Sequence, residues 1–152
     1  MDTTDRKILA ELQKNGRASL QEISQAAGLS STPCWTRMKR MEESGVIERY
    51  TVSLNAQALG LGDTVMVQVT LDSHSDNTLE KFGEILASIP EVVEAYLVSG
   101  EYDYLLRVAV KDTRDYERLL REKLYKIKGI RHSKSSFVLR TLKKADLPLL
   151  GI

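Results

Sequence analysis

The sequence predicts an α+β protein made of an amino-terminal winged helix-turn-helix and a carboxy-terminal ferredoxin-like βαββαβ sandwich. Three observations indicate this. The apolar spacing is helical up to about residue 45, it becomes extended after Gly45, and strand and helix patterns alternate from Asp63 onward. We therefore expect a helix-turn-helix domain over residues 1–54, a linker over 55–62 and the sandwich over 63–152.

The first two helices are indicated by apolar faces and by end signals. The apolar residues of range 8–12 share one helical face, and Gly16 is expected to end that helix. Ser19 followed by Glu22 forms a capping box that opens the second helix. Gly28 is expected to end it, because the residue after a helix often takes a positive φ, which glycine adopts without strain.

The third helix is expected to begin at Ser30 or Thr32, with Pro33 in its first turn, where the missing N–H does no harm. The apolar stripe of this helix is Cys34, Met38 and Met41. Cys34 is read as a small buried hydrophobe rather than a nucleophile. For Trp35, packing against the domain is favoured over contact with a partner or with DNA.

Hydroxyls and cations lie opposite this stripe, and such side chains bond phosphates and base edges. After the helix, Val46–Leu54 reads as two short strands that form the wing. The predicted DNA-binding residues are Ser31, Thr32, Pro33, Thr36, Arg37, Lys39 and Arg40, with Arg49 at the tip of the wing. The alternative is that this helix merely presents a charged face to solvent.

The carboxy-terminal part alternates between periods of two and 3.6 residues. Strands are expected over residues 65–71, 92–99, 102–110 and 130–143, and helices over 76–89 and 112–127. In this fold the helices cover one sheet face. The other face carries the apolar residues Met66, Tyr96, Val98, Leu105 and Val138, which predicts a dimer through the sheet.

Composition excludes several classes of protein. Cys34 is the only cysteine and the formal net charge is +1, which argues against a disulfide framework and against an overall basic coat. Two histidines, His74 and His132, stand at no zinc-site spacing from Cys34. No apolar run approaches the ~20 residues of a membrane span, and the segment MDTTDRK does not read as a secretory signal. A reduced, cytosolic protein is expected.

Several stretches together resemble the Lrp/AsnC family of feast/famine regulators. They are DRKILAELQKNGRASLQEIS, GLSSTPCWTRMKRMEESGVI, LVSGEYDYLLRV and SSFVLRTLK. The resemblance implies a bacterial or archaeal transcription regulator that binds double-stranded DNA, responds to an amino acid and uses no cofactor. It also implies a homodimer that assembles into tetramers, octamers or larger rings, in a bacterial, nucleoid-associated setting. STPCWTRMKRME and the later LPL are most similar to a subgroup that includes cysteine-responsive regulators.

The same resemblance marks SGEYDY as the loop that holds the amino-acid effector between dimers. Asp103 offers an anion for the α-ammonium group, while backbone N–H groups of the loop suit the α-carboxylate. The predicted effector-binding residues are Leu97, Ser99, Gly100, Tyr102, Asp103, Asp112, Ser135, Ser136 and Phe137. Without the resemblance, a plain hairpin in which Asp103 satisfies its own loop is the alternative.

Two other functions are compatible with this architecture. One is a haem-pathway decarboxylase-like enzyme, in which His74 or His132 serves as acid or ligand, although both stand in polar surroundings. The other is a ligand-binding adaptor without DNA contact, against which the intact cations and hydroxyls of residues 31–40 argue.

Overall fold

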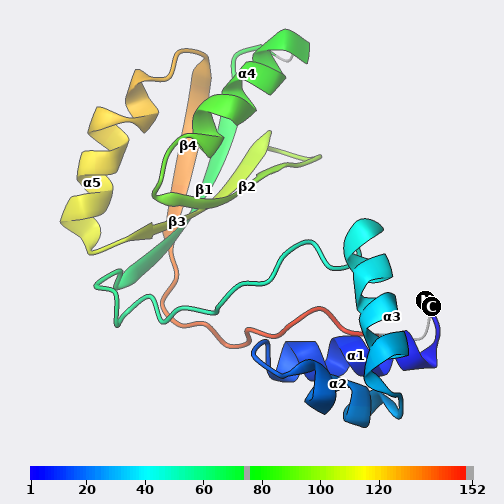
Figure 1. The fold of residues 1–152 in the computed structure, drawn as a ribbon. Helices are drawn as coiled ribbons and strands as arrows, with labels where there is room; N and C mark the ends of the chain where they lie inside the picture. Colours follow the sequence, from blue (N-terminus) through cyan, green and yellow to red (C-terminus); the bar gives the residue numbers. More distant parts are fainter. Residues whose placement is uncertain (74–75, 150–152) are drawn as a thin grey trace. The chain divides into compact units, whose positions relative to one another are not determined.

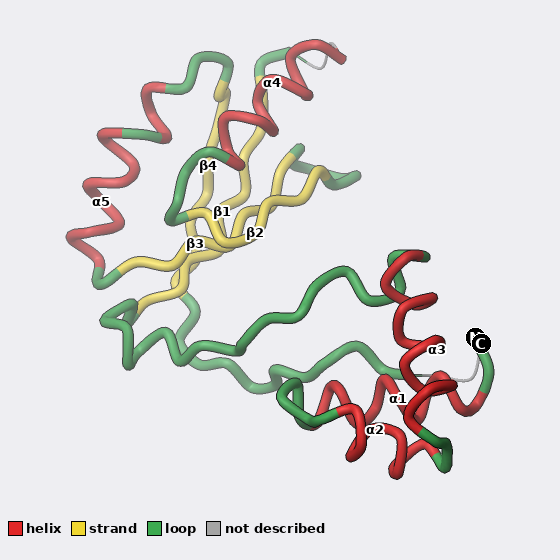
Figure 2. The backbone as a smooth tube through the Cα atoms, in the orientation of Figure 1, coloured by secondary structure: helices red, strands yellow, loops and turns green. Residues whose placement is uncertain are grey.

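The computed structural model describes residues 1–73 and 76–149, which fall into two compact units (Figures 1 and 2). One unit joins Met1–Leu54 to the described part of the tail after residue 142, and the other is Asn55–Leu142. The expected division put the whole tail into the sandwich. The difference arises because Leu149 packs against the helical core and Gln13 Nε2 donates a 3.0 Å hydrogen bond to the Leu147 carbonyl.

The helical unit contains α1 (Thr3–Lys14), α2 (Leu20–Ala27) and α3 (Ser31–Glu43). The predicted capping box of Ser19 and Glu22 is confirmed, and Gly28 follows α2 with φ +72°. A second capping box, formed by Asp2 and Asp5, opens α1. The three helices enclose a core of Ile8, Leu9, Ile23, Ala27, Cys34 and Met41. The buried position of Cys34 is confirmed, and burial raises the pKa of its thiol.

The prediction of two strands over Val46–Leu54 is wrong. The described chain between α3 and β1 contains no strand, and Figure 2 shows this segment as loop. Ile47 packs against the helical core, but Val46, Tyr50 and Val52 are exposed, so the segment lacks a continuous apolar face packed on the helices. A two-stranded ribbon without such packing is marginal in water.

The second unit has the predicted order of strands and helices. Its elements are β1 (Asp63–Leu71), α4 (Asp76–Ala87), β2 (Val92–Leu97), β3 (Tyr104–Val110), α5 (Thr113–Glu122), the 3₁₀ turn η1 (Leu124–Lys126) and β4 (Ile130–Phe137). The strands form one antiparallel sheet in the order β2-β3-β1-β4. Figure 1 shows α4 and α5 on one face of it. The ferredoxin-like sandwich is thus confirmed.

Two ends of elements in this unit differ from the expected ones by more than two residues. The last helix stops at Glu122 and continues as η1 rather than as one helix to Ile127. Strand β4 ends at Phe137 rather than near residue 143, because its neighbour β1 begins at Asp63. The Val138 N–H donates to the Thr64 carbonyl near the start of β1. Beyond this hydrogen bond, β1 offers residues after Val138 no further backbone partner.

The core of the sandwich comes from alternate residues of β1 and β3 and from the inner sides of the helices. These residues are Val65, Val67, Val69, Leu71, Phe82, Leu86, Ile89, Tyr104, Leu106, Val108, Val110, Tyr116, Leu119 and Leu124. None of the helices within the described residues is long and apolar enough to cross a membrane.

The sheet face away from the helices is more polar than predicted. Met66 pairs with Arg107 of β3, and Arg107 Nη2 donates to Glu94 Oε1 of β2 at 2.6 Å. Tyr96 and Leu105 pair with each other two residues further along the same strands. They supply apolar surface on this face, and Tyr96 is half exposed. An ion pair therefore lies on the surface through which a dimer was expected.

Candidate functional site

The exposed side of α3 presents most of the predicted DNA-binding residues together. Opposite the buried Cys34 and Met41, the exposed members are Ser31, Thr32, Pro33, Thr36, Lys39 and Arg40. The Thr36 hydroxyl donates to the Thr32 carbonyl at 3.1 Å, which leaves its oxygen able to accept. This side of α3 therefore offers hydroxyls and cations to an approaching ligand.

Arg37 departs from that arrangement, because it is half-buried against α1. Its Nη1 donates to Asp2 Oδ2 at 2.7 Å and to Asp5 Oδ1 at 2.8 Å. Arg40 Nη2 also donates to both oxygens of Asp5, at 2.9 and 2.8 Å. Asp5 is only 1% exposed. The structure thus binds both guanidinium groups to α1, and Arg37 is placed to hold α3 rather than to reach outward.

The sequence interpretation missed Asp2 and Asp5. The pattern of an acid followed three residues later by another acid signals a capping box. It carries no sign that the same carboxylates bind arginines 32 and 35 residues further along. Only the packing of α1 on α3 brings them together.

These hydrogen bonds shift the pKa of each carboxyl group. The Asp5 backbone N–H, followed by the Arg37 guanidinium, lowers the pKa of Asp2 to about 2. Burial opposes ionisation of Asp5, but the Asp2 backbone N–H and Arg37 together hold the pKa of Asp5 below its ordinary value. Both carboxylates are therefore charged at neutral pH, and they raise the pKa of Arg37.

Two further side chains near α3 lie open to solvent. Trp35 is 52% exposed, so the expected packing of its ring against the domain is not what the structure shows. Instead, Lys39 Nζ lies 5.2 Å from the centre of the ring. Arg49 is exposed in the extended segment after α3 rather than at the tip of a ribbon.

The predicted effector loop is the connection between β2 and β3. Asp103 fastens it to the end of β1 in two ways. Its backbone N–H donates to the Val69 carbonyl at 2.9 Å, and its Oδ2 accepts from the Leu71 N–H at 2.7 Å. Its carbonyl closes the loop by accepting from the Val98 N–H. The carboxylate thus has a structural role in addition to the predicted one of binding an ammonium group.

Gly100 is needed in this loop for its backbone conformation. Its φ is +136°, a region that other L-residues rarely adopt. A Cβ atom built at this position has no atom within 4 Å, so it is the positive φ and not a lack of space that favours glycine here. Ser99 and Gly100 are exposed, while Tyr102 and Asp103 are partly buried.

The predicted effector residues of β4 do not lie at this loop, whereas Leu97 stands at its start. Ser135 and Phe137 pair with Val67 and Val65 of β1, whereas Asp103 bonds the other end of that strand. Ser135 Oγ shares a 2.5 Å hydrogen bond with the Tyr116 hydroxyl, and Phe137 packs edge-on against the same ring at 5.4 Å. Ser136 alternates to the opposite sheet face.

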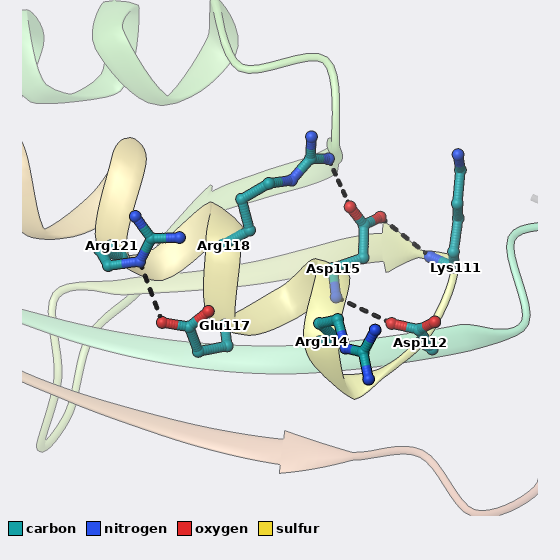
Figure 3. Close-up of a pocket in the computed structure, with 7 residues that line it drawn as sticks. All are labelled: Lys111, Asp112, Arg114, Asp115, Glu117, Arg118 and Arg121. Carbon is teal, nitrogen blue, oxygen red and sulfur yellow. Dashed lines mark hydrogen bonds and ion pairs between the residues drawn. The ribbon is translucent and has the colours of Figure 1, made fainter.

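Asp112 is also engaged elsewhere, since its side chain caps α5 by accepting from the Asp115 N–H at 2.8 Å. It lines a surface hollow of about 370 Å³. The other lining residues are Lys111, Arg114, Asp115, Glu117, Arg118 and Arg121 (Figure 3). Several of these charges pair with one another, as Asp115 does with Arg118 and Glu117 with Arg121. A single chain therefore does not assemble the predicted effector residues into one pocket.

Of the two histidines considered for enzyme chemistry, His132 lies exposed on β4, paired with Thr70. His74 lies outside the described residues. Among the described residues, no three His, Cys, Asp or Glu side chains come together as a metal site.

Comparison with known families covers both units. Residues 1–48 match a family described as winged helix-turn-helix DNA-binding, and residues 64–148 match one described as Lrp/AsnC ligand binding domain. The chain is 38% identical to the leucine-responsive regulatory protein of Escherichia coli K12 over 146 residues, which are 96% of this chain and 89% of that protein.

Two solved structures are similar over nearly the whole chain. An AsnC family transcriptional regulator from Agrobacterium tumefaciens superposes with a TM-score of 0.92 at 41% identity, covering 98% of this chain and 97% of that one. A transcriptional regulator of Neisseria meningitidis in complex with L-Met superposes with a TM-score of 0.91 at 33% identity, with the same coverage.

Proposed function

The chain belongs to the Lrp/AsnC family of amino-acid-responsive, DNA-binding transcription regulators, and from that premise we propose how its own residues perform the two tasks. The observation that carries the proposal is the exposed side of α3, where hydroxyls and cations stand opposite a buried stripe.

In this proposal α3 enters the major groove of duplex DNA. Thr32, Thr36 and Lys39 approach base edges and phosphates, and Arg40 reaches outward from its contact with Asp5. Arg37 serves as a positioning residue, since its guanidinium holds α3 against α1. Ser31, Pro33 and Arg49 border this surface.

Several acids lie close to these cations, so one helical unit alone is a weak DNA binder. Asp2 and Asp5 bond the arginines, and Glu43 lies 3.9 Å from Lys39. Tight binding then requires two linked units on one duplex, because the second contact forms at a high effective concentration. A dimer reading a pseudo-palindrome satisfies this requirement.

The DNA proposal is tested by the variant Thr36→Ala/Lys39→Ala, since neither side chain holds α3 in place. In titrations of a duplex enriched from a random library by the full chain, we expect weaker binding and a salt slope reduced by about one for each bound subunit. Lys126→Ala, an exposed cation of η1, is the matched control and should change neither value. Unchanged affinity of the α3 variant contradicts this role.

For the effector, we propose an L-α-amino acid with an apolar side chain, bound at the loop Leu97–Asp103. Two relatives support this class, since one is named leucine-responsive and another is in complex with L-Met. Leu97 is 61% exposed and Tyr96 is 51% exposed beside the loop. A second copy of the chain is proposed to cover them and to complete the site that one chain leaves dispersed.

Thermal melting of the full chain with leucine, methionine or cysteine tests the effector proposal. Asp103→Asn keeps an oxygen that can accept from the Leu71 N–H but removes the charge. We expect it to retain the melting temperature and to lose the stabilisation by amino acid, whereas Asp103→Ala should lose both. A normal response of Asp103→Asn would limit Asp103 to shaping the loop.

We also propose that the chain dimerises through the sheet face away from the helices and that the dimers assemble further. The protein is proposed to act in the nucleoid of a bacterial cell. Light scattering of the full chain checks the assembly. The family assignment favours regulation over the decarboxylase alternative, and the α3 face favours a DNA-binding protein over an adaptor without DNA contact.

A further inference from the structure

Trp35 is the only tryptophan of the chain, and it stands half exposed on α3. It follows the fully buried Cys34, so its ring leaves the helix about 100° away from the core direction. A half-exposed indole leaves a large apolar surface in contact with water. Packing in the core of the helical unit therefore does not explain why an aromatic ring stands at this position.

The ring joins the proposed DNA surface on one side. With successive residues 100° apart, Lys39, Thr32 and Thr36 all project within about 100° of Trp35. Lys39 Nζ lies 5.2 Å from the ring centre. This cation–π contact holds the indole beside the cation of Lys39. Arg40 lies at the far edge of the same surface, where Asp5 holds it.

An apolar ring among hydroxyls and cations suits a ligand that is mostly polar and carries one apolar group. In the major groove that group is the C5-methyl of thymine. Trp35 is in the first half of α3, and the first residues of a recognition helix reach base edges. Lys39, next to the ring, is then placed for the neighbouring phosphate.

We propose that Trp35 contacts a thymine methyl group in the major groove and so determines part of the sequence specificity. This inference rests on the proposed function, because α3 must first enter the groove. It assigns to Trp35 the recognition of one base, whereas Lys39 and Arg40 supply electrostatic attraction that differs little between sequences.

A thermodynamic cycle between protein and DNA tests the contact. The full chain is used to enrich a duplex from a random library, and each dT of that duplex is replaced singly by dU, which removes only the methyl group. For the unmodified chain we expect one such position to raise Kd about fourfold, the effect of one buried methyl group. For Trp35→Ala the same replacement should change Kd by less than about 1.5-fold.

Two variants serve as controls. Trp35→Leu keeps an apolar side chain and should retain part of the dU effect. Tyr125→Ala removes an exposed aromatic ring in the other unit and should retain all of it. Thermal melting of Trp35→Ala should match that of the unmodified chain, since its ring is not part of the core.

Fluorescence gives an independent readout, because all tryptophan emission of the chain comes from Trp35. Addition of the enriched duplex should quench it. If the chain binds the duplex and every dT-to-dU replacement affects Trp35→Ala as it affects the unmodified chain, the inference is overturned while DNA binding stands. Emission that responds to dilution but not to DNA places Trp35 in a subunit contact and also overturns it. If no duplex is enriched, the proposed function itself fails.

Discussion

Arg37 Nη1 and Asp5 Oδ1 lie 2.8 Å apart and join the third helix of the DNA-binding unit to the first. Asp5 is almost fully buried and also accepts from Arg40. The orientation of α3 is thus fixed by a buried carboxylate as well as by the apolar core. Arg37, which holds α3 against α1, and Lys39, which is proposed to bind DNA, are therefore two residues apart on the same helix.

Asp5→Asn is expected to destabilise the helical unit. It removes the charge that two guanidinium groups share, and hydrogen bonds to charged groups contribute about 1.5–3 kcal/mol each. We expect the free energy of unfolding to fall by about 2 kcal/mol in denaturant titrations. Glu43→Gln, which breaks only the exposed pair with Lys39, should change it by less than about 0.5 kcal/mol. Equal effects of the two variants would contradict the structural role of Asp5.

Acid should weaken the same cluster. The folded-state pKa values of Asp2 and Asp5 lie below those of an unfolded chain, with Asp2 at about 2. Their contribution to stability is therefore fully present above pH of about 4 and is lost as pH falls toward 2. In urea titrations across this range, Asp2→Asn/Asp5→Asn should show a smaller loss of stability on acidification than the unmodified chain. Parallel losses would show that other groups govern the acid response.

Replacement of Gly100 tests the conformation of the loop that is proposed to bind the effector. Gly100→Ala places a side chain at φ +136° and should lower the free energy of unfolding by about 1–3 kcal/mol, although open space surrounds the position. Gly83→Ala provides a matched control inside α4, where a Cβ also meets nothing within 4 Å. That change should stabilise the chain by about 0.5–1 kcal/mol, because alanine favours helix. Stabilisation by both changes would argue against strain at Gly100.

The tail is expected to stabilise the helical unit. Leu149 packs against its core, whereas the side chain of Leu147 is 82% exposed and only its backbone is bonded to Gln13. Leu149→Ala should therefore lower the stability of α1–α3 by about 1 kcal/mol, and Leu147→Ala should leave it unchanged. Native-state hydrogen exchange of the amides in α1 and α3 measures this directly. Equal protection in both variants would mean that the tail does not contribute.

The sequence was sufficient for the elements that have strong local signals. Alternation along Val65–Leu71, the capping box at Ser19 and the stripe containing Cys34 all report the burial of single faces, and the structure confirms each. The predicted wing strands are wrong because Val46–Leu54 has strand-forming residues but no partner strand within the described part of the chain. Strand formation depends on such a partner, which local propensity does not reveal.

The candidate site was predictable in its location more than in its contacts. Residue types on α3 indicated a polar face, yet they did not distinguish Arg37, which turns to α1, from Lys39, which faces solvent. The loop proposed to bind the effector was predicted from the family resemblance alone, while the contacts of Asp103 and Ser135 are hydrogen bonds across 32 and 19 residues. Hydrogen bonds between residues so far apart in the sequence form only once tertiary packing brings them together.

The most direct test of the regulator is equilibrium binding of the full chain to the enriched duplex and to a shuffled duplex of equal composition. The titrations are made at fixed salt, with and without the amino acid that raises the melting temperature. We expect the enriched duplex to bind roughly 10³-fold more tightly than the shuffled one, and the amino acid to shift that affinity several-fold. Equal affinity for the two duplexes, unaffected by the amino acid, would contradict the account.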